Sequence, residues 1–184
     1  MNQWIENYCR TFQTELEIKK LSPSDAVAFL DIRLIALRES PDSFIIDISE
    51  EEKETAQSIL PRIYDENQPS EIFVIGAFEQ GQLIGTSAFE RETRYKLRHK
   101  GTLWGVFILP NYRKRGIARI LVQKTIDTAK EIFELNQINI EVSGEFQRKF
   151  YESLGFVLWG VEKNGTKTDE NYLTWTHMVL NLRV

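Results

Sequence analysis

The chain has 184 residues, of which 42% are hydrophobic and 27% charged, values typical of one globular domain rather than a disordered, collagen-like or coiled-coil chain. Its net charge of −4 argues against nucleic-acid binding, and no apolar run approaches the ~20 residues that a membrane span needs. Cys9 is the only cysteine, which excludes an internal disulfide and a cysteine-based metal site. We therefore expect a single domain over residues 1–184, cytoplasmic, with no metal, membrane or nucleic-acid partner.

The first third of the chain predicts one strand and two helices. Residues 15–21 alternate as in a strand, and the segment 22–40 follows with an N-terminal cap, a proline at the first helical position and an apolar stripe. Ser49 and Glu52 have the spacing of a capping box, which predicts a second helix that Pro61 must end or kink.

From residue 71 onward, short β-branched and aromatic runs predict strands. Segments 71–79 and 83–90 read as a hairpin around Gly81, and 101–110 is a third apolar strand. An amphipathic pattern then predicts a helix over 116–133.

The last fifty residues continue the mixture of strands and helices. Segment 138–142 reads as a buried strand and 144–156 as a short helix ended by a glycine. Two further strands, 156–163 and 172–182, are expected around a turn at Asn164–Gly165. The whole chain therefore reads as one mixed α/β domain.

The junction between the strand 101–110 and the following helix concentrates positive charge. Backbone N–H groups and the positive dipole end make a helix N-terminus an anion site, and Gly116 and Ala118 are small enough to let a phosphate approach the backbone. Neither a P-loop nor a G-x-G-x-x-G motif is present. The segment predicts a site for a phosphate-bearing cofactor, and the alternative is a capped, basic, solvated helix start. The basic residues are Arg113, Lys114, Arg115 and Arg119.

The order of motifs V-F-I-L-P, R-K-R-G-I-A, amphipathic helix, short strand and F-Y-E-S-L-G-F resembles the GNAT superfamily of acetyl-CoA-dependent N-acetyltransferases. The resemblance spans essentially the whole chain and is most specific over residues 103–156. It implies an α/β fold with a mixed, mostly antiparallel sheet of about six to seven strands and helices on both faces. It also implies acetyl-CoA as the acetyl donor.

The resemblance further implies which residues hold acetyl-CoA. In the family, the basic glycine loop binds the pyrophosphate, and a bulge in the preceding strand hydrogen-bonds the pantetheine arm and opens a V-shaped slot toward strand 138–142. The corresponding strand residues are Val106, Phe107 and Ile108. The corresponding loop residues are Arg113, Lys114, Arg115, Gly116, Ile117, Ala118 and Arg119.

Two residues are carried over from the family as candidates for catalysis. Tyr151 stands four residues before a Gly-Phe pair and is the candidate acid that protonates the departing thiolate; its alternative role is that of an aromatic anchor. Glu141 is the candidate base for the amine, with Glu90 as a second candidate, and the alternative for both is a solvated carboxylate.

The sequence departs from the family at one position. An asparagine often stands seven residues before the tyrosine, where this chain has Gly144, and the loop between Val142 and Tyr151 looks about two residues shorter than usual. Ser143 is a candidate substitute for the missing cofactor contact.

The predicted function is acetyl transfer to a primary amine of a small molecule or peptide, by direct attack in a ternary complex, because the isolated cysteine offers no covalent acyl-enzyme. The alternative is a catalytically silent acyl-CoA-binding sensor or interaction domain. The excess of acidic residues favours a cationic amine. Trp104, Tyr172 and Trp175 are candidates to line the acceptor pocket, and the final strands are candidates to pair two copies into a homodimer.

Overall fold

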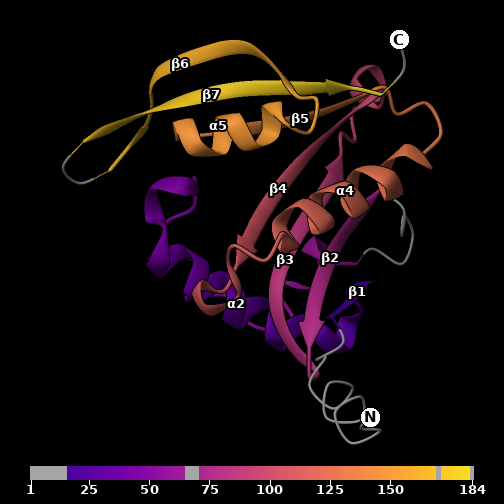
Figure 1. Ribbon diagram of the computed structural model, residues 1–184, viewed down its shortest axis with the longest axis vertical. Coiled ribbons are helices and arrows are strands. Elements are labelled where there is room, and N and C mark those ends of the chain that lie inside the picture. Colours follow the sequence, from indigo (N-terminus) through magenta and orange to yellow (C-terminus); the bar gives the residue numbers. More distant parts are fainter. Residues whose placement is uncertain (1–15, 65–70, 169–170, 183–184) are drawn as a thin grey trace, which may run out of the picture.

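The computed structural model describes residues 16–64, 71–168 and 171–182. Its seven strands form one sheet in the order β1-β2-β3-β4-β5-β7-β6 (Figure 1). Only β4 and β5 run parallel; every other neighbouring pair is antiparallel. The mixed, mostly antiparallel α/β architecture is therefore confirmed. The strands are β1 Leu16–Lys20, β2 Ile72–Glu79, β3 Gln82–Arg91, β4 Lys100–Ile108, β5 Gln137–Val142, β6 Val157–Lys167 and β7 Tyr172–Asn181.

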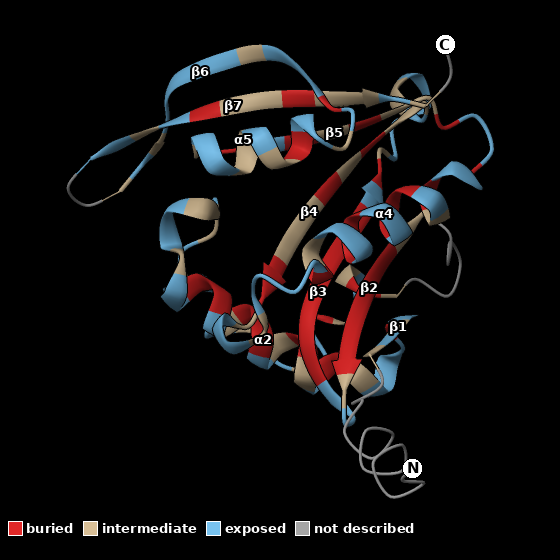
Figure 2. Ribbon diagram, in the orientation of Figure 1, coloured by how far each residue is buried: buried red, intermediate tan, exposed pale blue. Residues whose placement is uncertain are grey.

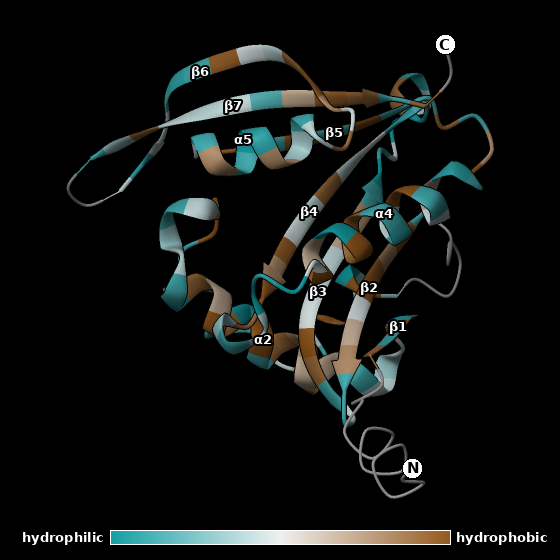
Figure 3. Cartoon of the chain, in the orientation of Figure 1, coloured by the Kyte–Doolittle hydropathy of each residue, from teal (hydrophilic) through white to brown (hydrophobic). Residues whose placement is uncertain are grey.

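Helices cover both faces of the sheet. The helices are α2 Ala26–Glu39, α3 Ile48–Glu51, α4 Ile117–Lys130 and α5 Glu145–Glu152. Buried side chains of α4 and α5, such as Leu121 and Tyr151, belong to one hydrophobic core, whereas Phe29 and Ile32 of α2 belong to a second core with Phe107. Figures 2 and 3 show that β2 and β3 are largely buried and carry mostly apolar residues, and α4 and α2 both pack against β3. Among the described helices, none is long and apolar enough to cross a membrane.

The first strand and the first predicted helix are observed, whereas the second predicted helix forms only as a short helix that does not reach Pro61. Cys9 and the first residue of the predicted strand 15–21 lie outside the described residues. Helix α3 has only four residues, and its cap is Asp47, whose Oδ1 accepts a hydrogen bond from the Ser49 N–H at 2.8 Å. The chain then leaves the helix, because Thr55 and Ser58 exchange side-chain and backbone hydrogen bonds that compete with helical ones.

The helix predicted over residues 116–133 forms as α4 but ends at Lys130. Glu134 adopts a left-handed φ of 64° in the turn that follows, and Phe133, the last residue of the predicted helix, is 78% exposed.

The turn predicted at Asn164–Gly165 is also wrong. Strand β6 continues through it to Lys167, and the ladder to β7 shifts register between Glu162 and Thr166. Asn164 has a left-handed φ of 58°, and a Cβ at Gly165 would lie 2.7 Å from Cδ1 of Trp175. Asn-Gly supplies the same backbone freedom to a bulge as to a turn, so the two are alike in sequence.

A bulge interrupts β4, as the family resemblance implies. The ladder with β3 shifts register between Thr86 and Ala88, so that Gly105 and Val106 together face Ser87. Gly105 has a φ of +60°, which favours glycine, and its carbonyl accepts a hydrogen bond from the Thr86 hydroxyl at 2.9 Å.

Beyond the bulge, β4 and β5 separate. Their parallel ladder pairs only residues 100–102 of β4 with 137–139 of β5. Farther along, β4 stays with β3 while β5 stays with β7 (Figure 1), and the sheet opens into a V. The expected slot is therefore present between β4 and β5.

Candidate active site

A cleft of about 1170 Å³ occupies the opening between β4 and β5. Its walls come from both arms of the sheet, the loop before α4, helix α5 and the segment after α2. It brings together the sequence-predicted residues Val106, Phe107, Ile108, Arg113, Lys114, Gly116, Ile117, Ala118, Arg119, Glu90, Glu141 and Tyr151. Arg115 is absent from this lining: its guanidinium pairs with Glu79 at 2.6 Å.

The loop before α4 presents an open helix N-terminus to the cleft. Gly116 caps the helix with a left-handed φ of 78°, and a Cβ at this position would meet nothing within 4 Å. The neighbouring Lys114 is also left-handed, with a φ of 63°. A charged group can therefore approach the backbone N–H groups of the first turn, which fits a pyrophosphate.

Two arginines, Arg113 in the loop and Arg119 in the first turn of α4, form hydrogen bonds at the walls of the cleft. Arg113 donates from Nε to the Ile108 carbonyl at 3.0 Å, which ties the loop to the end of β4. Arg119 donates from Nη2 to the Ser153 hydroxyl at 2.6 Å, just beyond α5. Positive charge is thus held at the mouth of the slot on both arms.

The edge of β4 directs backbone groups into the slot. The Leu109 N–H donates to the Ile84 carbonyl on the β3 side at 2.9 Å. Because backbone groups alternate sides along a strand, the N–H groups of Ile108 and Val106 are directed away from β3, where the ladder with β5 has already ended. This edge offers hydrogen bonds to an extended ligand.

Tyr151 lies on α5, on the α4 side of the slot. Its side chain is 5% exposed, with its ring edge-to-face against Phe150 at 5.0 Å and Phe156 at 5.5 Å between centroids. Burial raises the pKa of its hydroxyl well above the ordinary value, so the group stays protonated at neutral pH. It can donate a proton or a hydrogen bond.

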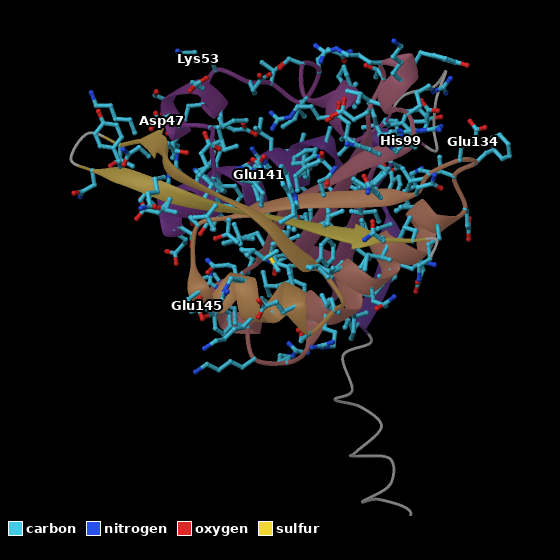
Figure 4. The ribbon with its side chains drawn as sticks, turned by 90° about the horizontal axis from the view of Figure 1, so that it is seen from above. Asp47, Lys53, His99, Glu134, Glu141 and Glu145 are labelled. Carbon is cyan, nitrogen blue, oxygen red and sulfur yellow. The ribbon has the colours of Figure 1, made fainter. Side chains whose placement is uncertain are left out.

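Glu141 lies on the opposite face of the slot from Tyr151. It stands at the exposed position of β5 between the buried Ile140 and Val142, and Figure 4 shows it centrally, between the later strands and the N-terminal elements. Thr102 pairs with Asn139 in the β4–β5 ladder, and Trp104 and Glu141 are each two residues further on. Alternation therefore puts Trp104 and Glu141 on the same face, one on each arm.

Sequence reasoning missed the partner of Glu141. His177 of β7 stands directly opposite it, with Nδ1 3.1 Å from Glu141 Oε1, and its Nε2 lies 3.0 Å from Glu162 Oε2. No local sequence pattern predicts this row of three side chains, because it depends on the register of two antiparallel strand pairs. His99, in contrast, lies apart from Glu141 (Figure 4).

Gln147 fills the space that the substitution at Gly144 leaves. A Cβ at Gly144, the N-cap of α5, would lie 2.1 Å from Oε1 of Gln147. The carboxamide also reaches across to the Ser43 hydroxyl at 3.4 Å and lines the cleft. An amide group is therefore present here, although the sequence position differs.

A buried ion cluster borders the cleft on the α2 side, and no local sequence pattern predicts it. Arg33 Nε donates to Glu51 Oε1 at 2.8 Å, and Arg62 Nη1 lies 3.2 Å from both carboxylate oxygens. Burial alone would raise the pKa of Glu51, but the two arginines outweigh it and the pKa is lowered. Trp104 and Trp175 line the cleft as expected, whereas Tyr172 does not and is 59% exposed.

A model of the acetyltransferase (GNAT) family matches residues 34–156, about two thirds of the chain. The chain belongs to the GNAT acetyltransferase family. The matched segment contains the bulged strand, the basic glycine loop and Tyr151, so the GNAT features lie in the region that forms the cleft.

Solved structures show the same fold. A GNAT-family acetyltransferase from Streptococcus pneumoniae has a TM-score of 0.78 and 21% identity, covering 92% of this chain and 100% of its own. The putative acetyltransferase yncA from Salmonella typhimurium, solved with its cofactor acetyl-CoA, has a TM-score of 0.76 and 18% identity, covering 92% and 95%. A ribosomal-protein-alanine N-acetyltransferase from Brucella melitensis has a TM-score of 0.71 and 21% identity, covering 90% and 99%.

Proposed function

We propose that this GNAT protein transfers an acetyl group from acetyl-CoA to the primary amine of a small molecule or peptide, by direct attack in a ternary complex. One observation carries the proposal: the bulge and splay of β4 bring the basic loop, Tyr151 and Glu141 to a single cleft. The structure of yncA, solved with its cofactor acetyl-CoA, supports acetyl-CoA as the donor.

The donor half of the cleft lies on the α4 side. The N–H groups after Gly116, together with Lys114 and Arg119, would hold the pyrophosphate, and the β4 edge at Val106 and Ile108 would hydrogen-bond the pantetheine arm. When bound, acetyl-CoA supplies the acetyl group as an activated thioester. The open backbone at Gly116 and the unpaired edge of β4 fit this ligand.

The two proton transfers of the reaction are carried out by residues on opposite faces of the slot. An alkyl ammonium has a pKa of ~10.4, so the incoming amine is protonated at neutral pH and must lose a proton before it can attack. Glu141, oriented by His177, accepts this proton. The Val106 N–H donates a hydrogen bond to the acetyl oxygen, and Tyr151 donates its proton to the departing sulfur. Glu90 also lines the cleft and is the second candidate for the base.

We also propose that Gln147 takes over the contact left open by Gly144. Its carboxamide occupies the space beside the helix N-cap, where it faces the cleft. Gln147→Ala should raise the Kd for acetyl-CoA about tenfold, the effect of losing one hydrogen bond of ~1.4 kcal/mol. Calorimetric titration of the variant measures this, and an unchanged Kd would remove Gln147 from the cofactor site.

A homodimer through the final strands is proposed on the position of β6. This strand is the edge of the sheet and carries exposed Val157, Trp159 and Val161. Edge strands with apolar side chains favour pairing with a second copy. Sedimentation should give twice the chain mass, and Trp159→Lys should give the monomer; a monomeric wild type would contradict the proposal.

The experiment that tests the function is direct detection of the product. The full chain is incubated with acetyl-CoA carrying an isotope-labelled acetyl group and with pools of amino acids, polyamines, aminoglycosides and short peptides. Mass spectrometry should find the labelled acetyl group on a nitrogen of one pool. Labelled ester or thioester products with no labelled amide would contradict N-acetylation.

A silent acyl-CoA-binding domain is the second candidate, favoured by the glycine at position 144. The same experiment separates the two. Tight acetyl-CoA binding without a labelled product in any pool would support the silent domain.

A further inference from the structure

The ion cluster beside the cleft carries more positive than negative charge. Arg33 and Arg62 share the single carboxylate of Glu51, so one positive charge remains unbalanced within the cluster. Arg33 and Arg62 line the cleft, whereas Glu51 does not and is 1% exposed behind them. The excess charge is therefore presented to whatever enters the cleft from the α2 side.

The cluster lies against the bulge at which the acetyl group would be transferred. Arg33 Nη1 is 3.8 Å from the position that a Cβ on Gly105 would take. Both guanidinium groups lie 5.5 Å from the ring centroid of Trp104, the residue before Gly105. An anionic group bound by the arginines would thus stand next to the reacting centre.

Hydrogen-bond donors in this region are incompletely used. Within the described residues, Arg33 donates only from Nε, and Arg62 only from Nη1, to a carboxylate. The indole Nε1 of Trp104 is buried and has no described partner. Buried donors without acceptors are rare, and three side chains with spare donors around one place point to an oxygen-bearing anion.

Negative charge faces this cluster from elsewhere in the cleft. Glu141 lies on the other arm of the slot, on the same face as Trp104, and Glu90 and Glu92 also line the cleft. An acceptor between these groups meets cations on one side and carboxylates on the other. Apolar lining from Phe44, Ile45 and Ile46 adjoins the arginines.

We infer that the acceptor is a zwitterionic amino acid, whose carboxylate binds Arg33 and Arg62 and whose amine faces Glu141; this rests on the proposed acetyl transfer. The ammonium loses one proton to Glu141, the nitrogen bonds to the acetyl carbon and the carbon–sulfur bond breaks. Tyr151 donates its hydroxyl proton to the sulfur. The nitrogen then loses a second proton, which restores the hydroxyl of Tyr151. The products are an N-acetyl amino acid, the free thiol and one proton.

The test compares acceptors that differ only in the carboxylate. L-leucine and L-phenylalanine are each assayed beside their amides and their decarboxylated amines, with thiol release as the readout. The wild type should give a kcat/KM at least about tenfold higher for the amino acids, as a charge-assisted hydrogen bond implies. Equal or higher values for the amides or amines would overturn the inference while leaving acetyl transfer standing.

Two variants test whether the preference for a carboxylate depends on the ion cluster. Arg62→Gln, chosen because Arg62 is 27% exposed and leaves the buried Arg33–Glu51 pair intact, should lower the amino-acid-to-amine ratio about tenfold or more. Arg38→Gln is the matched control, since Arg38 is 57% exposed on α2 and pairs with Glu52 outside the cleft; its ratio should equal that of the wild type. An unchanged ratio in Arg62→Gln would overturn the inference.

A binding measurement keeps the inference separate from turnover. N-acetyl-L-leucine should raise the melting temperature of the wild type more than N-acetyl-isoamylamine does, and the difference should shrink in Arg62→Gln. If this holds without thiol release from any acceptor, the carboxylate site stands and the proposed function fails. If the two ligands raise the melting temperature equally, the carboxylate site is rejected.

Discussion

Removing the hydroxyl oxygen of Tyr151 tests its proposed role in catalysis. Tyr151→Phe keeps the ring packed against Phe150 and Phe156 but removes the proton donor. We expect kcat to fall by about 10²- to 10⁴-fold with the Kd for acetyl-CoA nearly unchanged. Tyr112→Phe is the control, because Tyr112 also lines the cleft, but next to the basic loop. Parallel losses of turnover and affinity in Tyr151→Phe would make the tyrosine an anchor.

The raised pKa of Tyr151 also predicts the alkaline behaviour of the enzyme. Burial disfavours the phenolate, so the protonated form persists above the ordinary tyrosine pKa of 10.0. The kcat of the wild type, measured by thiol release at saturating acceptor, should therefore not decline up to about pH 10. A decline centred near neutral pH that Tyr151→Phe abolishes would show a hydroxyl that titrates too early for this role.

Among the elements, Gly116 in the loop before α4 and Gly81 in the turn between β2 and β3 form a matched pair of glycines. Gly116 and Gly81 have φ values of +78° and +79°, and a Cβ at either would meet nothing within 4 Å. Alanine at each position should cost a similar ~1–2 kcal/mol of unfolding free energy from left-handed strain. Only Gly116→Ala should also weaken acetyl-CoA binding, measured by calorimetry, because only Gly116 faces the cleft. Equal affinities for the two variants would contradict the pyrophosphate assignment.

Sequence reasoning succeeds for elements whose signals are local. The strand 101–110, the glycine at the start of α4 and the alternation of β2 and β3 carry their own periodicity, so these elements could be predicted. The helix expected from Ser49 is present only as α3, because Asp47 provides the cap and the chain leaves the helix after Glu51. The turn expected at Asn164–Gly165 fails because a bulge uses the same backbone freedom.

Contacts between distant segments escape prediction for a different reason. The Glu141–His177–Glu162 chain depends on how three strands align, and the Arg33–Glu51–Arg62 cluster depends on where α3 packs against α2. No spacing in the sequence encodes either. The basic loop and Tyr151 could be proposed because family motifs mark them in the sequence. On the acceptor side, Glu141, Trp104 and Trp175 are candidates from the sequence and line the cleft, whereas the ion pairs around them could not be predicted.

Across the whole molecule, Glu51 joins segments that are far apart in sequence. Its folded pKa is lowered, so its stabilising effect is complete above the unfolded pKa of about 4.3 and is lost as pH falls through the lower folded value. At pH 7, Glu51→Gln should lower the free energy of unfolding by about 3–5 kcal/mol, because it leaves buried guanidinium charge unpaired.

Urea titrations from pH 7 down to about pH 3 measure this effect. Glu52→Gln is the control: Glu52 is 50% exposed in its pair with Arg38, so its loss should cost under about 1 kcal/mol. The variant Glu51→Gln should also lose less stability on acidification than the wild type does. Equal effects of the two substitutions would contradict the buried pairing.

The central claim is that the cleft joins acetyl-CoA to an amine, and thiol release tests it most directly. The full chain is mixed with acetyl-CoA, and free thiol is followed with and without each amine pool. The account predicts release above the hydrolysis background in at least one pool and a dependence of that rate on Tyr151. Background rates in every pool, together with no calorimetric binding of acetyl-CoA, would contradict both the cofactor assignment and the proposed activity.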